Sequence, residues 1–347
     1  MRQSLDKNLL AAVLALGAIS LLTIFASNRS LAASQSAFWV VGLLILFASS
    51  QFYYKNWQRL SLPFYLASAI ALFLVYIAGE TVRGSTRWIE LGAFRFQPSE
   101  IAKVASVVLL ASFFEKRSAG KVGNIFLSLA IISPVFALIF LEPDIGSSAA
   151  IIAVWGTIAY AAGLKKRQAA GLFLIFCALA VIGYGVLAPY QKERIRTFIN
   201  PSRDPLDAGY NIIQSKIAIG SGRILGRGLG RGPQSQLNFL PESESDFIFA
   251  SVAEQFGLLG AGTVILMYAL FLIKVASIAK TSDRFGQLIT IGAFGLFAYQ
   301  FAVNVGMNMG IIPVTGITLP FVSYGGSSLI ASLLLLGIVL ASRSEKY

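Results

Sequence analysis

Residues 9–26 read LLAAVLALGAISLLTIFA, an apolar run without a charged side chain. A helix needs about 20 such residues to cross the hydrocarbon core of a bilayer. The run follows a short basic tail containing Arg2 and Lys7, as a secretory signal would, but no small-residue cleavage site leads into soluble sequence. We therefore interpret it as a retained first membrane span.

Similar runs recur along the whole chain of 347 residues, of which 56% are hydrophobic and 13% charged, with a mean hydropathy of +0.72. This composition predicts an all-α polytopic membrane protein with one membrane domain over residues 1–347 and about ten transmembrane helices. It also predicts a large outer loop, 191–246, between spans 7 and 8, and a re-entrant outer loop before span 10. The predicted spans are 9–26, 37–52, 62–79, 98–115, 124–141, 147–164, 168–190, 247–273, 287–306 and 327–342.

Lysine and arginine residues indicate the orientation of the spans, because short cytoplasmic connections carry an excess of them. Alternate connections and both tails are basic, so we expect both termini in the cytoplasm. Segments 80–97, 142–146, 191–246 and 306–326 then fall on the outer face. The net charge of +12 is explained by this topology and by anionic membrane lipids, so we expect no nucleic-acid partner. The basic residues of the expected cytoplasmic connections are Lys55, Arg59, Lys116, Arg117, Lys121, Lys165, Lys166, Arg167, Lys274, Lys280 and Arg284.

Cysteine and histidine chemistry is excluded by composition. The single cysteine, Cys177, lies in an apolar run, and the chain has no histidine. An intramolecular disulfide, a thiolate metal cluster and a serine–histidine–aspartate triad are therefore all ruled out. Any catalysis has to use carboxylates, lysine or tyrosine.

An acidic loop runs directly into an apolar helix at residues 239–249, FLPESESDFIF. Asp246 stands at this boundary, where a carboxylate caps free N–H groups and suits the positive end of the helix dipole. A carboxylate held there also suits a general base acting on a sugar hydroxyl. The two interpretations are compatible.

Two further outer segments carry paired charges. Glu100 and Lys103 follow a helix-starting proline and lie three residues apart, so they meet on one helix face, either as a structural ion pair or next to a substrate headgroup. In the turn 142–146, EPDIG, Asp144 is expected to cap the sixth helix. The alternative is that it lines the site or holds a divalent cation that bridges a pyrophosphate.

Two glycine-rich segments complete the set. The run 220–232 lacks the strand, helix and Gly-Lys-Ser/Thr ending of a phosphate loop, so we expect turns, with Arg223, Arg227 and Arg231 available to an anionic headgroup. The segment 310–328 is apolar but broken by Pro313 and Pro320. Irregular backbone at membrane depth must be buried in protein or line a cavity, which predicts a re-entrant loop over a site.

These segments together resemble the SEDS family of bacterial membrane proteins (shape, elongation, division and sporulation), whose members include RodA and FtsW. The segment Gln234-Ser235-Gln236-Leu237 is closer to RodA, whereas 316–320 leans toward FtsW, and we favour the RodA type. Where the family commonly has His-Thr before its essential aspartate, this chain has Glu244-Ser245. The elements that carry the resemblance are Arg87-Trp88-Ile89, Gln97-Pro98-Ser99-Glu100 with Lys103, Glu142-Pro143-Asp144-Ile145-Gly146, Gly209-Tyr210, Gln214-Ser215, Phe239-Leu240-Pro241-Glu242, Asp246-Phe247-Ile248-Phe249-Ala250 and Leu319-Pro320-Phe321-Val322-Ser323-Tyr324-Gly325-Gly326-Ser327-Ser328.

The resemblance implies a multi-pass protein of the bacterial cytoplasmic membrane that polymerises lipid II at the outer face as a peptidoglycan glycosyltransferase, paired with a class B penicillin-binding protein. By position, the family's essential aspartate falls on Asp246. We expect the substrate-binding residues to be Lys103, Glu100, Trp88, Arg87, Asp144, Arg194 and Arg223.

The expected reaction is an inverting transfer with undecaprenyl pyrophosphate as the leaving group. No cofactor is required by the sequence. A divalent cation, magnesium or manganese, is the one that a pyrophosphate leaving group would call for, and its ligands are unknown. The alternative functions are a lipid II flippase, which needs a polar path across the membrane, and a scaffold for cell division or elongation.

Overall fold

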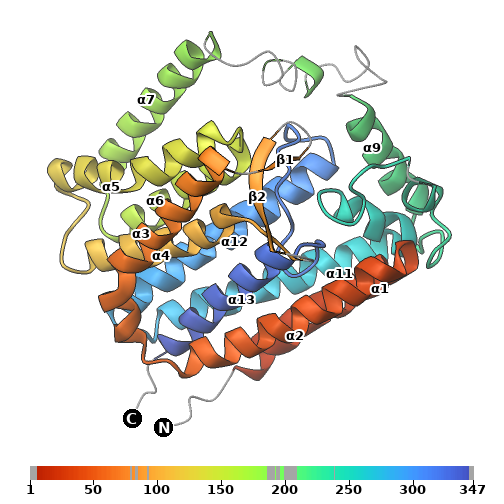
Figure 1. The fold of residues 1–347 in the computed structure, drawn as a ribbon, viewed down its shortest axis with the longest axis horizontal. Helices are drawn as coiled ribbons and strands as arrows, with labels where there is room; N and C mark the ends of the chain where they lie inside the picture. Colours follow the sequence, from red (N-terminus) through yellow and green to blue (C-terminus); the bar gives the residue numbers. More distant parts are fainter. Residues whose placement is uncertain are drawn as a thin grey trace.

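The computed structural model describes residues 6–78, 80–82, 85–91, 94–185, 192, 196–198, 209–237 and 239–343. Within them the fold is a helical bundle with a small three-stranded sheet at one end (Figure 1). The helices are α1 (Lys7–Ser27), α2 (Arg29–Gln51), α3 (Tyr54–Ala78), α4 (Pro98–Glu115), α5 (Val122–Leu141), α6 (Ile145–Ala161), α7 (Lys166–Tyr184), α9 (Tyr210–Gly222), α10 (Pro233–Gln236), α11 (Ile248–Ala279), α12 (Arg284–Asn308) and α13 (Gly326–Ala341).

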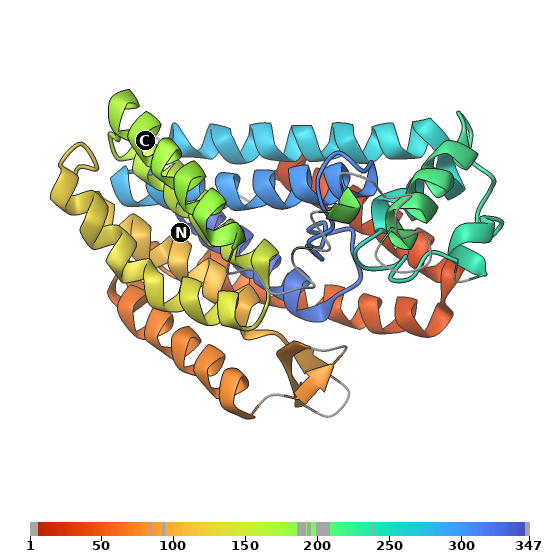
Figure 2. The ribbon, with the colours of Figure 1, turned by 90° about the horizontal axis from the view of Figure 1, so that it is seen from above.

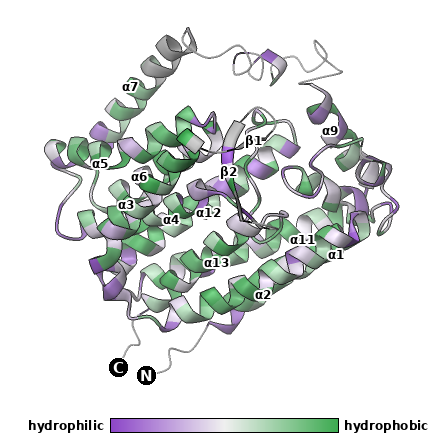
Figure 3. Cartoon of the chain, viewed as in Figure 1, coloured by the Kyte–Doolittle hydropathy of each residue, from purple (hydrophilic) through white to green (hydrophobic). Residues whose placement is uncertain are grey.

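The expected all-helical membrane architecture is confirmed. Six helices, α1, α2, α3, α5, α11 and α12, are long and apolar enough to cross a membrane by length and composition. Helices α6 and α13 are apolar but shorter, and α4 carries the charges Glu100, Lys103 and Glu115. Hydrophilic residues gather toward the ends of the bundle, as expected when its middle lies in lipid (Figure 3).

The seventh predicted span was expected to extend to residue 190, but α7 ends at Tyr184 and residues 186–190 lie outside the described part of the chain. Figure 1 shows α7 inclined away from the other helices at one edge of the bundle.

The centre of the bundle is formed by α4, α12 and α13. Helix α13 packs against α2, while α12 packs against α6, α11 and α4. Close approach depends on small residues: a β-carbon on Gly337 of α13 would lie 1.9 Å from the Ser49 Oγ of α2. Such small side chains at helix contacts are typical of membrane bundles, where lipid supplies no hydrophobic drive for association.

Both described ends of the chain lie at the same end of the bundle. The Arg343 guanidinium is 3.6 Å from the Asp6 carboxylate. In the view from above, α1, α11 and α12 run along a common direction away from that end (Figure 2). A chain that crosses the membrane an even number of times has both of its ends on the same side.

The connection between α3 and α4 holds a sheet that the sequence analysis missed. Strands β1 (Glu80–Val82), β2 (Ser85–Leu91) and β3 (Phe94–Phe96) pair antiparallel in that order. The Ser327 Oγ at the start of α13 donates to the Arg95 carbonyl of β3 at 2.9 Å, so the sheet is fixed to the bundle.

The irregular segment 309–325 is buried in its second half, at residues 319–323, whereas Met309 and Ile311 are 46% and 64% exposed. Phe321 and Val322 are at most 1% exposed. The Ser20 Oγ of α1 donates to the Val322 carbonyl, and the Gln35 amide of α2 donates to the Ser323 carbonyl and accepts from the Gly325 N–H. Side chains from the first two helices thus provide the hydrogen bonds that the broken backbone lacks.

Candidate functional site

The charged pair predicted on α4 is present and buried. The Lys103 Nζ donates to the Glu100 Oε1 at 2.8 Å, and the two residues are 2% and 6% exposed. Pro98 starts the helix, and the side chains meet because they are three residues apart. A buried charge is costly unless it is paired, and here each side chain supplies the other with its partner.

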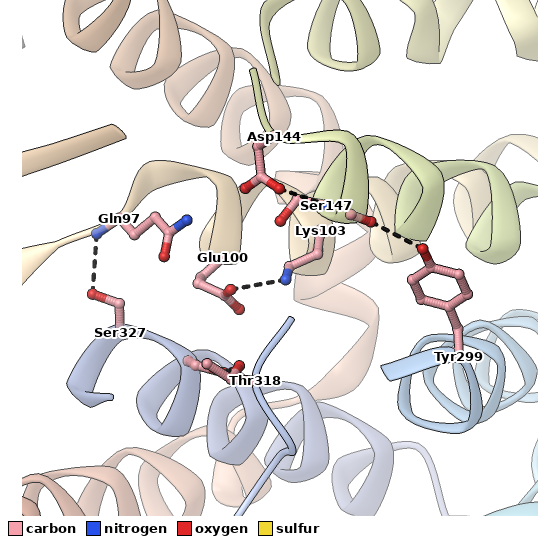
Figure 4. A network of polar contacts seen from close by, with 10 residues as sticks. Gln97, Glu100, Lys103, Asp144, Ser147, Tyr299, Thr318 and Ser327 are labelled. Atoms are coloured by element: carbon pink, nitrogen blue, oxygen red, sulfur yellow. Dashed lines mark hydrogen bonds and ion pairs between the residues drawn. The ribbon is translucent and has the colours of Figure 1, made fainter. Parts of the chain in front are cut away.

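Asp144 caps α6 as predicted. Its carboxylate accepts from the Ser147 N–H at 3.0 Å, and the Tyr299 hydroxyl of α12 donates to the Gly146 carbonyl at 3.2 Å. Figure 4 shows Asp144 and the Glu100–Lys103 pair gathered in one place, although they come from different helices. The sequence-predicted polar residues of α4 and α6 therefore belong to one cluster.

Arg87 of β2 holds the turn before α6. Its Nε donates to the Glu142 carbonyl at 2.9 Å, and its Nη2 donates to the Pro143 carbonyl. The Glu142 carboxyl is 1% exposed, and within the described part of the chain its two oxygens have no hydrogen-bond partner. Burial, with a further contribution from the negative charge of Asp144, raises the pKa of Glu142 to about 8, against the opposing effect of Arg87. Glu142 is therefore mostly neutral at pH 7.

Asp246 lies in a segment that other elements fix through its backbone. The amides of Asn304 and Asn308, on α12, each donate to the Asp246 carbonyl at 3.0 Å. Both asparagines are 0% exposed. The prediction that Asp246 caps α11 is wrong by one residue: Phe247 occupies the N-cap position. The tertiary bonds to Asp246 decide where the helix begins.

The 315–318 segment lies between Asp246 and the start of α6. A β-carbon on Gly316, whose φ is +75°, would lie 3.4 Å from the Asp246 Oδ2. On the other side, a β-carbon on Gly146 would lie 2.7 Å from the Ile317 Cγ1. The carboxylate of Asp246 and the Asp144 cluster are thus on opposite sides of one stretch of irregular backbone.

The remaining expected site residues are more dispersed. Trp88 is half-buried on β2, next to Arg87. Arg194 lies outside the described residues. Arg223 is exposed on the loop after α9, and no contact joins it to the α4 and α6 cluster.

Sequence reasoning missed the two asparagines. Their signal was present, because Asn304 and Asn308 are four residues apart in an otherwise apolar helix, a spacing that places both amides on one face. Glu254 of α11 also makes hydrogen bonds to a distant segment. Its carboxylate accepts from the N–H groups of Gln234 and Ser235 at 2.9 and 3.1 Å, and so ties α10 to α11.

A family model for FtsW, RodA and SpoVE, described as cell cycle protein, matches residues 8–347. The chain belongs to this SEDS family. The resemblance stated from the sequence is therefore confirmed.

Two comparisons describe the place of the chain in the SEDS family. Peptidoglycan glycosyltransferase MrdB of Escherichia coli K12 is 36% identical over 349 residues, covering 99% of this chain and 94% of MrdB. A solved structure entitled "Structural coordination of polymerization and crosslinking by a peptidoglycan synthase complex" superposes with a TM-score of 0.86 at 30% identity, covering 98% of both chains.

A third SEDS protein, the rod shape determining protein RodA of Thermus thermophilus, superposes with a TM-score of 0.74 at 28% identity over 98% of both chains. These coverages show that the likeness extends over the whole bundle and includes the segments that carry Asp144 and Asp246.

Proposed function

We propose that this protein is a peptidoglycan glycosyltransferase that polymerises lipid II at the outer face of the bacterial cytoplasmic membrane. The observation that carries the proposal is the position of Asp246, in a segment fixed by two buried asparagines and across the 315–318 backbone from Asp144 and the Glu100–Lys103 pair. MrdB, a SEDS relative that matches nearly the full length, is named for this activity.

In the proposed reaction, the carboxylate of Asp246 takes the proton from the 4-hydroxyl of the GlcNAc of an acceptor lipid II. The freed oxygen bonds to the anomeric carbon of the MurNAc at the end of the growing strand. The bond from that carbon to the pyrophosphate oxygen breaks, and undecaprenyl pyrophosphate leaves with the bonding electrons. Attack opposite the leaving group inverts the anomeric carbon.

The leaving pyrophosphate needs positive charge close to it. We assign this role to Lys103 and Arg87, together with Arg194 of the outer loop, while Glu100, Asp144 and Trp88 complete the substrate site. Arg223, which was expected among these residues, is exposed on the loop after α9, away from the α4 and α6 cluster, so we do not assign it to the pyrophosphate. Lys103 is held in place by Glu100, so its ammonium is available without reorganisation.

A divalent cation stays an expectation. Among the described residues, no three carboxylates lie close enough together to hold a metal ion by themselves. Asp144 is the residue that would hold a magnesium or manganese ion, and the ion would offset the negative charge of the pyrophosphate. No step of the proposed reaction passes through this ion.

We also propose a class B penicillin-binding protein as partner, because the peptidoglycan synthase complex that resembles this chain coordinates polymerisation with crosslinking. Cytoplasmic termini are proposed on the basis of the basic connections at that end of the bundle. The RodA-like segments favour a role in elongation over division.

The test is polymerisation of labelled lipid II by purified protein with its partner, read as glycan strands on a gel. We expect strands from the wild type and none from Asp246→Asn. The matched control is Asp283→Asn at the opposite end of the bundle, where the carboxylate caps α12 and accepts from the Tyr54 hydroxyl, and this variant should polymerise normally. Full activity of Asp246→Asn would remove the aspartate from the mechanism. Movement of lipid II across vesicles without strand synthesis would support a flippase instead.

A further inference from the structure

The loop between α9 and α10 exposes both cationic and aliphatic side chains. We call residues 223–231 the rim loop. Its Ile224, Leu225 and Leu229 are 63%, 76% and 45% exposed. Its three arginines are also exposed, and they make no side-chain hydrogen bond or ion pair with any residue that the structure describes. They are Arg223, Arg227 and Arg231.

The backbone of the rim loop is fixed to α11. Helix α11 is broken at Gly257, whose φ is +66°. The N–H groups of Leu258 and Leu259, which lose their helical partners at this break, donate to the carbonyls of residues 223 and 224 at 2.8 and 3.2 Å. In return, the N–H groups of residues 227 and 228 donate to the carbonyls of residues 254 and 255 at 2.9 and 3.1 Å. The loop completes the hydrogen bonding of the broken helix, so its side chains project from a rigid frame.

Glycine is required for this frame. A β-carbon on Gly226 would lie 2.1 Å from the Gln255 carbonyl oxygen, and one on Gly257 would lie 2.3 Å from the Gly226 nitrogen. Backbone atoms cannot yield as a flexible side chain does. The run of glycines that the sequence analysis assigned to turns is thus explained by contact between two backbones.

Two helices indicate the depth of the rim loop in the membrane. From Leu258 to Ala279, α11 rises about 33 Å at 1.5 Å per residue, which matches a hydrocarbon core of about 30 Å. Helix α1, with 21 residues, spans a similar height, and the carbonyl of Ala26 near its end accepts from the Gln236 amide just beyond the rim loop. Both helices have their other end on the side of the chain termini. The rim loop therefore lies at the outer boundary of the hydrocarbon core.

We propose that the rim loop is a binding site for anionic phospholipids of the outer leaflet. Its arginines meet the phosphate groups, since guanidinium matches phosphate geometry and each basic residue near an anionic surface contributes to binding. Its three aliphatic residues, with the exposed Leu258 and Leu259 of α11, enter the acyl chains below. Segments that anchor at a membrane interface have the same arrangement, with basic side chains at the headgroups and aliphatic side chains in the acyl region.

A bulk phospholipid fits this site better than the substrate. One pyrophosphate needs cations that converge on it, whereas these arginines are spread four residues apart along the loop and have no common partner. They also lie beside the outer half of α11, with no contact to the cluster of Asp144 and Lys103. The proposal depends on the orientation of the protein and not on its catalytic activity.

The test uses a local reporter. Leu225→Trp places an added tryptophan in the rim loop, and its emission, taken as the difference from the parent protein, is quenched by bromine on lipid acyl chains. The protein is reconstituted in phosphatidylcholine vesicles that contain the same mole fraction of either brominated phosphatidylglycerol or brominated phosphatidylcholine. We expect phosphatidylglycerol to be preferred by at least about five-fold, the effect of one basic residue at an anionic surface, with a smaller preference in high salt.

The decisive variant is Arg223→Gln/Arg227→Gln/Arg231→Gln, which breaks no bond in the fold and should abolish the preference. The matched control, Lys165→Gln/Lys166→Gln/Arg167→Gln, removes the same charge from exposed positions at the other end of the bundle and should retain it. Equal quenching by the two brominated lipids overturns the proposal. So does absence of quenching by both, which would place the loop in water. Protection of the added tryptophan by lipid II alone would assign the arginines to the substrate and also overturn it.

Discussion

Removal of the Asn308 amide tests how far α12 controls the catalytic segment. This side chain is 0% exposed and makes three good hydrogen bonds. It donates to the carbonyls of Asp246 and Asn304 at 3.0 and 2.8 Å, and accepts from the Ala250 N–H at 3.0 Å. Asn308→Ala breaks all three, while Asn304 still holds the Asp246 carbonyl.

The expected magnitude follows from these bonds. A buried hydrogen bond contributes about 1 kcal/mol in soluble proteins and about 0.6 kcal/mol between membrane helices, so three of them contribute about 2–3 kcal/mol. Two of the three act on the segment from Asp246 to Ala250. If half of their contribution aligns Asp246 in the transition state, the polymerisation rate at saturating lipid II falls by about three- to five-fold.

The assay combines equilibrium unfolding in mixed detergent micelles with the lipid II gel assay. Asn124→Ala is the matched control, because Asn124 donates one bond to the Ser118 carbonyl in an exposed turn. We expect the control to unfold within about 0.5 kcal/mol of the wild type and to polymerise normally. If Asn308→Ala has the stability and the polymerisation rate of the wild type, the reasoning is refuted. If it loses stability but keeps the wild-type rate, Asn308 stabilises the fold without aligning Asp246.

Three further predictions follow from the buried charges and the kink. Lys103→Met should destabilise the protein by about 3–5 kcal/mol because Glu100 is left charged and unpaired, and adding Glu100→Gln should restore much of that stability; equal unfolding midpoints for the single and double variants would contradict this. Gly257→Ala should lower the unfolding midpoint and expose the amides of the kink to hydrogen exchange, since a β-carbon there meets the Gly226 backbone; unchanged exchange at Leu258 would argue against the packing described. The pKa of Glu142 is raised to about 8 in the folded protein. As pH rises from the pKa of this group in the unfolded chain toward 8, the unfolded chain loses the proton and the folded protein keeps it, so the folded protein loses stability. Glu142→Gln should therefore gain stability over the wild type with rising pH in that range, and a pH-independent difference would show that Glu142 does not titrate there.

Much of the fold and part of the site were predictable because they depend on local sequence. The apolar runs predicted the helices, because a segment embedded in lipid has to form its backbone hydrogen bonds within itself. The Glu100–Lys103 pair follows from a three-residue spacing, and the capping role of Asp144 from the residue type before a helix. Each of these features is decided within one turn of helix.

The features that were missed depend on residues distant in the chain. The observed N-cap, Phe247, lies one residue after the predicted cap, Asp246, because Asn304 and Asn308, about 60 positions later, bind the Asp246 carbonyl. The kink at Gly257 depends on a loop about 30 residues earlier. The strands β1 to β3 are short and lie between two strongly apolar helices, so the hydrophobic periodicity of the sequence did not predict them.

The bonds from α1 and α2 to the irregular segment 309–325 have a consequence for synthesis of the protein. The ribosome makes Ser20 and Gln35 early, and their partners at residues 322 and 323 almost last. The backbone of residues 322–325 completes its hydrogen bonds only when it packs against these two side chains. A nascent or truncated chain that already contains Asp246 therefore lacks a completed site, and we expect polymerase activity to arise only when the end of the chain has been inserted against its beginning.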